Sequence, residues 1–342
     1  MMGGAMTDTP TPSGLTQAAV AAPLLVRLHN WIGDVVVGLP ALQLLADHGV
    51  PLQLVGKGWA ASLLAGPGWP VHPLPQGLRP RVALWRGLRR QQQGAAPGAP
   101  DSAARPRGAV DALLLATSFS AALEPRLAGL KTMGYATDHR RWLLQRAAVP
   151  ATGPHALQGY WQLACQFLDV QRAPPADIGL TLTPAATAHA AALRAGHGVG
   201  ADYIVLCPFA VGTLAGQRKS WPGFPALAAR LAAEGLTVLL CPGPGEEGPA
   251  QQQFPTAIAL NQVPLGTYAA LMKSARLVVA NDTGPGHLAA AVGAPLVSVL
   301  GPTLAAQWAP WGQRVKVVQV AQGWPGVDAV AREARAWLSP SG

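Results

Sequence analysis

Short apolar runs alternate with helical patterns along most of the chain, and this alternation restricts the fold more than any other feature. The runs in the first half include 23–28 and 110–116, and the series starts again at 203–207 after a proline-containing stretch. Strands that alternate with helices in this way form parallel sheets. A chain of 342 residues also exceeds what one hydrophobic core usually supports. The sequence therefore predicts an α/β protein with two Rossmann-like domains that face each other across a cleft.

The domain boundaries are placed where this pattern is interrupted. A run rich in glutamine, alanine and proline has no hydrophobic periodicity and is typical of a loop. The predicted segments are a disordered tail (1–22), an N-terminal Rossmann-like domain (23–175) with a low-complexity loop (91–108), a linker (176–200), a C-terminal Rossmann-like domain (201–325) and a C-terminal helix (326–342).

The net charge of +9 is concentrated in the first half of the chain. Between Arg79 and Arg146 there are twelve Lys and Arg residues against four acidic ones, whereas 200–330 has seven against six. A positive surface attracts nucleic acid, anionic lipid headgroups or phosphorylated substrates. Because no aromatic residues are interleaved with the basic ones and no nucleic-acid-binding signature occurs, a nucleic-acid partner is not expected. An anionic acceptor at a membrane surface fits this charge, and so does a merely solvated surface.

The cysteines and the apolar segments indicate a cytoplasmic protein. The three cysteines are far apart and have no metal-ligand spacing, so neither a disulfide framework nor a metal site is predicted from them. No apolar stretch approaches the roughly 20 residues of a membrane span, and the first 22 residues do not have the pattern of a secretory signal.

A glycine-rich turn at 281–287 is the first candidate site. It follows an apolar run, and it contains Asp282, Thr283, Gly284 and His287, with Pro285 at the first position of a predicted helix. Such a helix start binds anions through free N–H groups and the helix dipole. The same residues also suit simple helix capping. Both interpretations, diphosphate binding and capping, remain open from this stretch alone.

The stretch 207–222 follows the first strand of the second half and supplies Thr213 and Lys219. A phosphate-binding P-loop requires lysine directly after the second glycine, and here two residues intervene, so an ATPase is not predicted. A lysine on this loop would still lie at the same sheet edge as the glycine-rich turn. Since no Asp-X-Asp pair occurs, we expect Lys219 and the helix start, rather than a metal ion, to stabilise a departing diphosphate.

Asp34 is the candidate in the first half. It directly follows Gly33 at a predicted helix start. An aspartate at this position can cap the helix, or it can act as a general base that removes a proton from a sugar hydroxyl.

At this point the sequence resembles a known family. "NDTGPGHLAAAVGAPLVSVLGPT", with "RKSWP" and "IGDVVVGLP", is similar to glycosyltransferase family 9, the ADP-heptose:lipopolysaccharide heptosyltransferases. The stretches 113–144 and 155–164 resemble its heptosyltransferase II branch. The resemblance covers most of residues 24–338.

The resemblance implies a GT-B fold, with the acceptor in the first domain and the nucleotide sugar in the second. It also implies metal-independent transfer of heptose from ADP-heptose to the lipopolysaccharide inner core, with inversion and without a cofactor. Asp34 then corresponds to the base and Lys219 to the diphosphate-binding lysine. The remaining donor-binding residues are Thr213, Asp282, Thr283, Gly284 and His287. The C-terminal helix is expected to pack back on the first domain.

The acceptor side follows the family less closely, because the chain has Thr117-Ser118-Phe119 where the branch usually has Asn-Ser-Phe. Ser118, Arg140 and Arg141 are the candidate acceptor-binding residues, and the expected acceptor is an anionic glycolipid at the cytoplasmic face of the inner membrane, where peripheral contact is expected. Two alternatives remain open. One is a family 9 enzyme with another nucleotide sugar or acceptor, and the other is a catalytically silent nucleotide-binding module.

Overall fold

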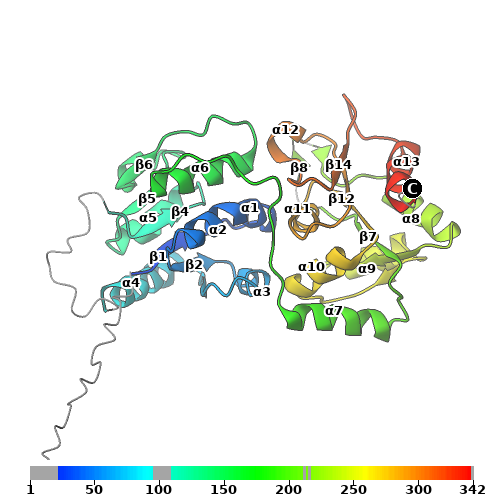
Figure 1. Ribbon diagram of the computed structural model, residues 1–342, viewed down its shortest axis with the longest axis horizontal. Coiled ribbons are helices and arrows are strands. Elements are labelled where there is room, and N and C mark those ends of the chain that lie inside the picture. Colours follow the sequence, from blue (N-terminus) through cyan, green and yellow to red (C-terminus); the bar gives the residue numbers. More distant parts are fainter. Residues whose placement is uncertain (1–21, 95–108, 211–212, 215–216, 340–342) are drawn as a thin grey trace, which may run out of the picture.

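The computed structural model describes residues 22–94, 109–210, 213–214 and 217–339. It contains two α/β domains side by side, each built on a six-stranded parallel sheet (Figure 1). The α/β class and the two Rossmann-like domains are therefore confirmed. The predicted tail lies outside the described residues except for Ala22.

The N-terminal sheet has the strand order β3-β2-β1-β4-β5-β6. Its strands are β1 (Leu24–Arg27), β2 (Leu52–Gly56), β3 (Val71–Pro73), β4 (Ala112–Leu114), β5 (Thr132–Tyr135) and β6 (Arg146–Ala148). The order reverses direction at β1, and in open α/β sheets ligands bind at the carboxyl ends of the strands near such a reversal.

Helices cover both faces of this sheet because its strands are apolar on both sides. The helices are α1 (Ile32–Val37), α2 (Leu39–Asp47), α3 (Trp59–Leu63), α4 (Leu78–Gly94), α5 (Phe119–Leu127) and α6 (Ala156–Leu168), with a 3-10 turn at Arg141–Leu143. Val26 of β1 belongs to the cluster with Leu45 of α2 and Leu157 of α6. Its neighbour Leu25 points to the opposite face and packs with Trp85 of α4. The layer of α4 and α5 thus lies on the other side of the sheet from α1, α2 and α6.

The C-terminal sheet repeats this plan with the order β11-β10-β7-β12-β13-β14. Its strands are β7 (Tyr203–Cys207), β10 (Thr237–Leu240), β11 (Ile258–Ala259), β12 (Leu277–Asn281), β13 (Leu296–Val299) and β14 (Val315–Val318). Its helices are α7 (Pro184–Gly196), α8 (Phe224–Ala233), α9 (Glu247–Gln253), α10 (Leu265–Ser274), α11 (Gly284–Ala291), α12 (Ala305–Trp308) and α13 (Val327–Leu338). A short antiparallel pair, β8 (Thr213–Leu214) and β9 (Gln217–Arg218), follows β7.

One hydrophobic cluster continues from one domain into the other. It contains Val26 and Leu45 from the N-terminal domain together with Val205, Leu271 and Leu288 from the C-terminal domain. Helix α1 packs against α11, and α3 packs against α10. The two domains therefore share a core along the side where α1, α10 and α11 meet.

The predicted loop 91–108 is wrong at its start, because α4 continues to Gly94. Gln92 holds this last turn in place: its side chain is buried and donates to the carbonyls of Pro23, at 2.6 Å, and Asp111, at 3.1 Å. The remainder of the predicted loop, 95–108, lies outside the described residues.

The segment 176–200, predicted as a linker, contains the 13-residue helix α7, so that prediction is wrong. The Thr183 side chain caps this helix by accepting from the Ala186 N–H at 3.1 Å, and Pro184 occupies its first turn. Helix α7 packs on α10, and Leu180 N–H donates to the Ala291 carbonyl at 2.8 Å. The segment therefore belongs to the C-terminal domain.

The C-terminal helix does not pack back on the first domain, and this prediction is also wrong. The apolar stripe of α13 includes Val330, Ala331 and Ala334, which are buried with Leu206 and Val279. Its partners are α8 and the strands β12, β13 and β14. The stripe thus covers the face of the C-terminal sheet opposite α10 and α11, and the sheet itself separates the helix from the N-terminal domain.

Among the helices that the structure describes, none has the length and apolarity needed to span a bilayer.

Candidate active site

The glycine-rich turn lies at the carboxyl end of β12, in the middle of the C-terminal sheet. Thr283 is the N-cap of α11 with an extended backbone, and Pro285 is the second residue of the helix, one position later than predicted. Gly284, which begins the helix, and Gly286 carry no side chain that would shield the free N–H groups. This turn therefore presents N–H donors and the positive end of a helix dipole.

Asp282 joins the turn to three other side chains. Its Oδ2 accepts from Lys219 Nζ at 3.2 Å and from Thr303 Oγ1 at 2.6 Å. The Nε2 atom of His287 lies 3.7 Å from Asp282 Oδ1, which is longer than a hydrogen bond. The structure thus brings together Lys219, Asp282 and His287. This was predicted from the sequence, although Lys219 belongs to one motif and the other two residues to another. Thr303 was not predicted, although it is the last residue of the stretch 281–303 that resembles the family.

The electrostatics of this cluster keep Asp282 ionised. Burial by itself raises the pKa of the Asp282 carboxyl, but its contacts with His287 and Thr303 and the positive charge of Lys219 outweigh burial and lower the pKa below its usual value. The resulting carboxylate holds the Lys219 ammonium beside the start of α11, and the lysine side chain remains 29% exposed. The site therefore combines a fixed cation with a helix N-terminus.

Asn281 attaches the loop 207–222 to this turn. Its fully buried side chain accepts from Trp221 N–H at 2.9 Å and donates to the Pro208 carbonyl at 2.7 Å. Both ends of the loop that carries Lys219 are therefore fixed to the last residue of β12. Thr213 lies in β8 on the same loop, but its side chain is outside the described part of the chain, so its role stays a prediction.

Asp34 lies in the first turn of α1, at the carboxyl side of β1. Its Oδ1 accepts from the phenol of Tyr160 at 2.9 Å, and its Oδ2 lies 3.6 Å from His29 Nδ1. The Asp34 side chain is 14% exposed. Burial lowers the pKa of His29, although the Asp34 carboxylate opposes this effect. Asp34 is therefore a partly accessible carboxylate whose orientation is fixed by a phenol.

The two halves of the site touch through glycines. A Cβ atom on Gly33 would lie 2.9 Å from His287 Cδ2 and 3.7 Å from Gly284 Cα. A Cβ atom on Gly284 would lie 2.9 Å from Ile32 Cβ. Only glycine permits this approach of α1 to α11. Asp34, the next residue after Gly33, therefore lies on the part of α1 that approaches the glycine-rich turn of the other domain.

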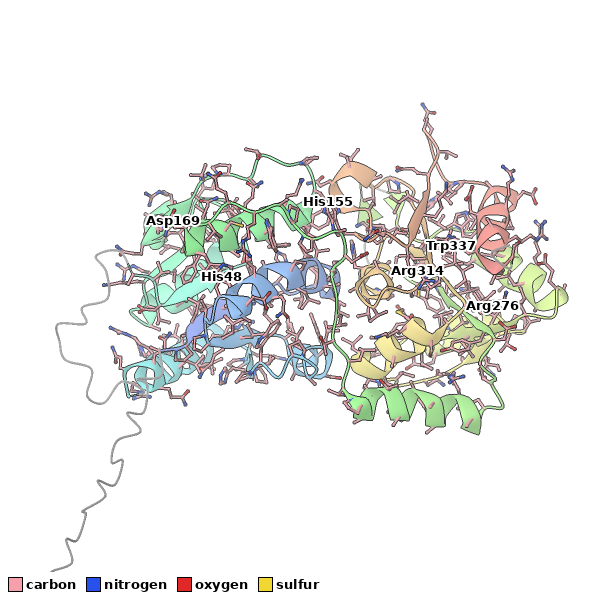
Figure 2. All side chains as sticks on the ribbon, in the orientation of Figure 1. His48, His155, Asp169, Arg276, Arg314 and Trp337 are labelled. Carbon is pink, nitrogen blue, oxygen red and sulfur yellow. The ribbon has the colours of Figure 1, made fainter. Side chains whose placement is uncertain are left out.

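Helix α6 connects the two domains at a second point. His155, its N-cap, accepts from Leu157 N–H through Nδ1 at 3.1 Å and donates from Nε2 to the Ala309 carbonyl at 2.8 Å. Figure 2 shows His155 at the junction of the domains. The same helix carries Tyr160, which contacts Asp34. Tyr160, His155 and His29 were not predicted as site residues, since nothing in a helical pattern indicates which carboxylate a tyrosine meets.

The predicted acceptor residues lie on loops at the carboxyl edge of the N-terminal sheet. Ser118 and Arg141 are exposed, and their role stays a prediction. Arg140 is fully buried, and its guanidinium donates to the carbonyls of Tyr135, Ala116 and Ser118 at 2.6–3.1 Å. Burial lowers its pKa to about 10. Contrary to the prediction of direct acceptor contact, Arg140 is buried and connects the loop after β4 to the loop after β5.

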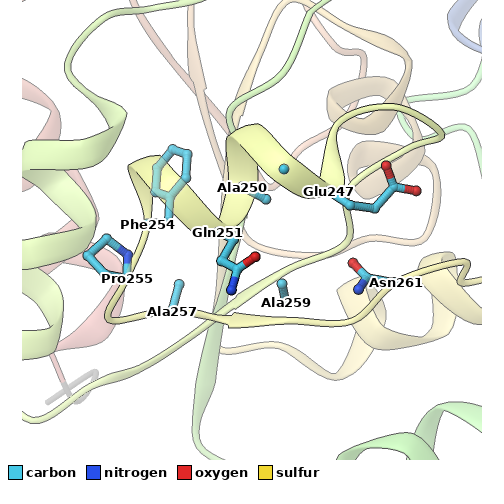
Figure 3. Close-up of a pocket in the computed structure, with 9 residues that line it drawn as sticks. Glu247, Ala250, Gln251, Phe254, Pro255, Ala257, Ala259 and Asn261 are labelled. Atoms are coloured by element: carbon cyan, nitrogen blue, oxygen red, sulfur yellow. The ribbon is translucent and has the colours of Figure 1, made fainter.

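A hollow in the C-terminal domain lies apart from these residues. It is lined by residues of α9, β11 and their connection, including Glu247 and Gln251, and by Asn261 just after β11 (Figure 3). Strand β11 is the edge strand, three positions from β12 in the sheet, and no predicted site residue lines this hollow.

Comparison with known proteins relates this geometry to one family. Residues 108–334 match the family described as "Glycosyltransferase family 9 (heptosyltransferase)". Lipopolysaccharide heptosyltransferase 3 of Escherichia coli is 32% identical over 128 residues, which cover 34% of this chain and 36% of that protein. Lipopolysaccharide heptosyltransferase 1 of Pseudomonas aeruginosa is 34% identical over 166 residues, which cover 46% and 43%. The chain thus spans less than half the length of these curated relatives.

Solved structures match the whole fold. The E. coli ADP-heptose LPS heptosyltransferase II has a TM-score of 0.74 at 21% identity, with 92% of this chain and 98% of that chain covered. A family 9 glycosyl transferase from Veillonella parvula has a TM-score of 0.77 at 16% identity, with 94% and 99% covered. E. coli heptosyltransferase WaaC with ADP has a TM-score of 0.68 at 20% identity, with 92% and 99% covered. The predicted GT-B arrangement is confirmed.

Proposed function

The chain belongs to glycosyltransferase family 9, and we propose that it transfers heptose from ADP-heptose to the inner core of lipopolysaccharide. The observation that carries this proposal is the contact of α1 with α11 through Gly33 and Gly284. In this proposal the contact brings the helix that carries Asp34 to the helix start that binds the diphosphate, so that one base and one anion site serve an inverting transfer. The names of the curated and structural relatives support the choice of sugar and acceptor.

In this proposal the C-terminal domain binds the nucleotide sugar. The diphosphate lies at the N-terminus of α11, and Lys219 neutralises part of its charge. As the bond between the anomeric carbon and the diphosphate breaks, negative charge grows on the ADP oxygen. The helix start and the ammonium, both already in place, stabilise that charge without a metal ion or any other cofactor.

Asp34, from the N-terminal domain, serves as the base. It takes the proton from an acceptor hydroxyl as the hydroxyl oxygen attacks the anomeric carbon. The new carbon–oxygen bond forms on the side opposite the departing ADP, so the configuration at the anomeric carbon is inverted. Tyr160 fixes the orientation of the carboxylate through its hydrogen bond.

The acceptor is proposed to be a lipid-anchored, anionic saccharide that binds to the N-terminal domain. Its location would be the cytoplasmic face of the inner membrane, and the surplus of Lys and Arg residues in that domain supports an anionic partner. Ser118 and Arg141, both exposed at the carboxyl edge of the sheet, are the proposed acceptor contacts.

The experiment is a transfer assay with ADP-heptose and heptose-deficient lipopolysaccharide core, combined with ADP binding. The Asp34→Asn variant should lose turnover and retain ADP affinity, because the carboxylate is removed while the donor turn is intact. Asp47→Asn, a change of an exposed aspartate in α2, is the matched control and should behave as the wild type.

The outcomes separate the alternatives. A wild-type protein that binds ADP and hydrolyses or transfers other nucleotide sugars, but not ADP-heptose, belongs to a different donor class. One that binds ADP and transfers nothing to any acceptor is a silent nucleotide-binding module. Full activity in Asp34→Asn would contradict the assignment of the base.

A further inference from the structure

The outward side of α4 and α5 carries a basic surface. It consists of five exposed side chains, which we call the arginine face: Arg79, Arg86 and Arg90 of α4, Arg126 of α5, and Lys131, which lies after α5 and directly before β5. The three arginines of α4 are spaced i, i+7 and i+11, and at 3.6 residues per turn this spacing puts them on one stripe of the helix. None of the 17 residues of α4 is acidic. The stripe is about 16 Å long at 1.5 Å per residue.

Two acidic side chains contact α4 or the Lys131 end of this surface, and the buried one, Glu124, is turned away from it. Glu124 of α5 is 1% exposed and forms an ion pair with Arg81 at 2.8 Å. Asp111 accepts from the Lys131 N–H at 2.8 Å through Oδ2. Arg81 and Arg89, the other two arginines of α4, lie partly buried and donate to main-chain carbonyls at Pro75 and Ala128. The positive charge of the arginine face is thus not cancelled by Glu124.

Two leucines are exposed within the same surface. Leu78 begins α4 and is 47% exposed, and Leu127 ends α5 and is 48% exposed. Arg86 Nη2 lies 3.4 Å from the Leu127 carbonyl, which brings the leucine beside the stripe. Exposed aliphatic side chains among arginines are a combination that suits the boundary between lipid headgroups and acyl chains.

We propose that the arginine face, with Leu78 and Leu127, binds the surface of an anionic phospholipid bilayer. Its charge is complementary to the negative headgroups, and the two leucines enter the interface. Figure 1 shows α4 and α5 at the end of the N-terminal domain that is far from the C-terminal domain. Binding there leaves the contact between α1 and α11 uncovered. The inference deepens the proposed function, on which it rests for the lipid-anchored acceptor, by naming the surface that meets the membrane.

The test compares the full chain with the triple variant Arg79→Gln/Arg86→Gln/Arg90→Gln. Cosedimentation is measured with vesicles of phosphatidylcholine alone and of phosphatidylcholine with phosphatidylglycerol, at low and at high salt. The matched control, Arg172→Gln/Lys273→Gln/Arg332→Gln, removes the same charge from exposed positions elsewhere. Each basic residue near an anionic surface contributes about fivefold to binding, so the triple variant should bind the anionic vesicles about a hundredfold more weakly.

The expected result is salt-sensitive binding of the wild type and the control to anionic vesicles only, with loss in the triple variant. Equal binding by the triple variant, equal binding to both lipid mixtures, or binding of a transfer RNA in place of vesicles would overturn the proposal.

A Leu127→Ser variant should bind anionic vesicles several-fold more weakly and keep the salt sensitivity. Transfer to a water-soluble core saccharide without lipid should be unchanged in the triple variant. The two assays separate this inference from the proposed function. If the wild type binds anionic vesicles but transfers no heptose, the proposed function fails and the inference stands. If the wild type transfers heptose but does not bind the vesicles, the inference fails and the proposed function stands.

Discussion

The phenol of Tyr160 donates a 2.9 Å hydrogen bond to Asp34 Oδ1, and the two residues are 126 positions apart in the chain. Burial raises the pKa of Tyr160 well above its ordinary value, and the nearby Asp34 carboxylate raises it further. Tyr160 is therefore a neutral hydrogen-bond donor at neutral pH. A carboxylate that is held by a permanent donor loses little orientation when the acceptor arrives.

Replacing Tyr160 by phenylalanine should lower kcat about tenfold or more, because a hydrogen bond to a charged group contributes about 1.5–3 kcal/mol. The affinity for ADP should not change, since the phenol donates its hydrogen bond to Asp34 and not to the glycine-rich turn. Tyr135→Phe is the matched control: its phenol is also directed at α6 but donates to the Gly159 carbonyl at 2.6 Å. Steady-state kinetics of both variants and ADP titration decide the matter. An equal fall of kcat in both would indicate a packing effect instead.

Lys219→Met should weaken ADP binding by about 1.5–3 kcal/mol, the range for charge-assisted hydrogen bonds. Methionine retains most of the side-chain volume, so the loss reports the charge. Isothermal titration calorimetry measures the affinity, and Lys273→Met, at the last turn of α10, provides the control. Wild-type affinity in a folded Lys219→Met variant would show that the ammonium does not bind the diphosphate.

Gly284→Ala should reduce kcat/KM roughly tenfold to a hundredfold, the effect of a misplacement of about 1 Å. The new Cβ would lie 2.9 Å from Ile32 Cβ, an atom that cannot rotate away from the helix backbone. Gly87→Ala is the control, because that position lies inside α4 with open space, and there alanine should stabilise the fold by about 0.5–1 kcal/mol.

A second change identifies the cause of the Gly284→Ala defect. Ile32→Gly removes the atom that the new methyl group meets, so the double variant should recover part of the activity. If the double variant is no better than Gly284→Ala alone, crowding between α1 and α11 is not the reason for the loss.

The free energy of unfolding should fall as the pH is lowered through about 6.5, partly because of His155. Burial lowers the pKa of His155, the hydrogen bond to Ala309 opposes this, and His287 lowers the pKa further. Below the ordinary pKa of histidine, His155 takes up a proton in the unfolded state but not in the folded state. The free energy of unfolding therefore decreases with falling pH by up to about 1.4 kcal/mol per pH unit. Protonation would also place an N–H of His155 against the Leu157 N–H.

Urea unfolding of the wild type and of His155→Asn at pH 7.5, 6.5 and 5.5 checks this prediction. The variant lacks the titrating ring, so its stability should decrease less between the first and the last pH. His29 and His72 also have pKa values lowered by burial and should preserve part of the slope. Identical slopes in the two proteins would contradict a role for His155.

The strands and the donor turn were predictable because their signals are local. A run such as 203–207 is apolar on both faces, which is typical of a central parallel strand, and Pro285 after Thr283 marks a helix start. The approach of Lys219 to Asp282 followed from topology, since Asp282 directly follows β12 and the loop that carries Lys219 follows the neighbouring parallel strand β7.

The errors have a common physical origin. The apolar stripe of α13 shows that one face is buried, but the sequence does not say against which sheet, and the stripe faces β12 to β14. Arg140 belongs to a basic stretch that suits a solvated surface, yet three main-chain carbonyls bind its guanidinium in the interior. Tyr160 and Asp34 meet only because α6 crosses α1. Tertiary packing, which no local pattern contains, decides each of these cases.

The hydrophobic cluster that runs through both domains also bears on how such chains diverge. Gly33 and Gly284 fit together only as a pair, and Leu45 and Leu288 belong to the same cluster although they lie in different domains. A hybrid that joins the first domain of this protein to the second domain of a relative would bring together surfaces that never adapted to each other. Exchange of acceptor specificity between family members by domain transfer should therefore succeed only when α1 and α11 come from the same parent.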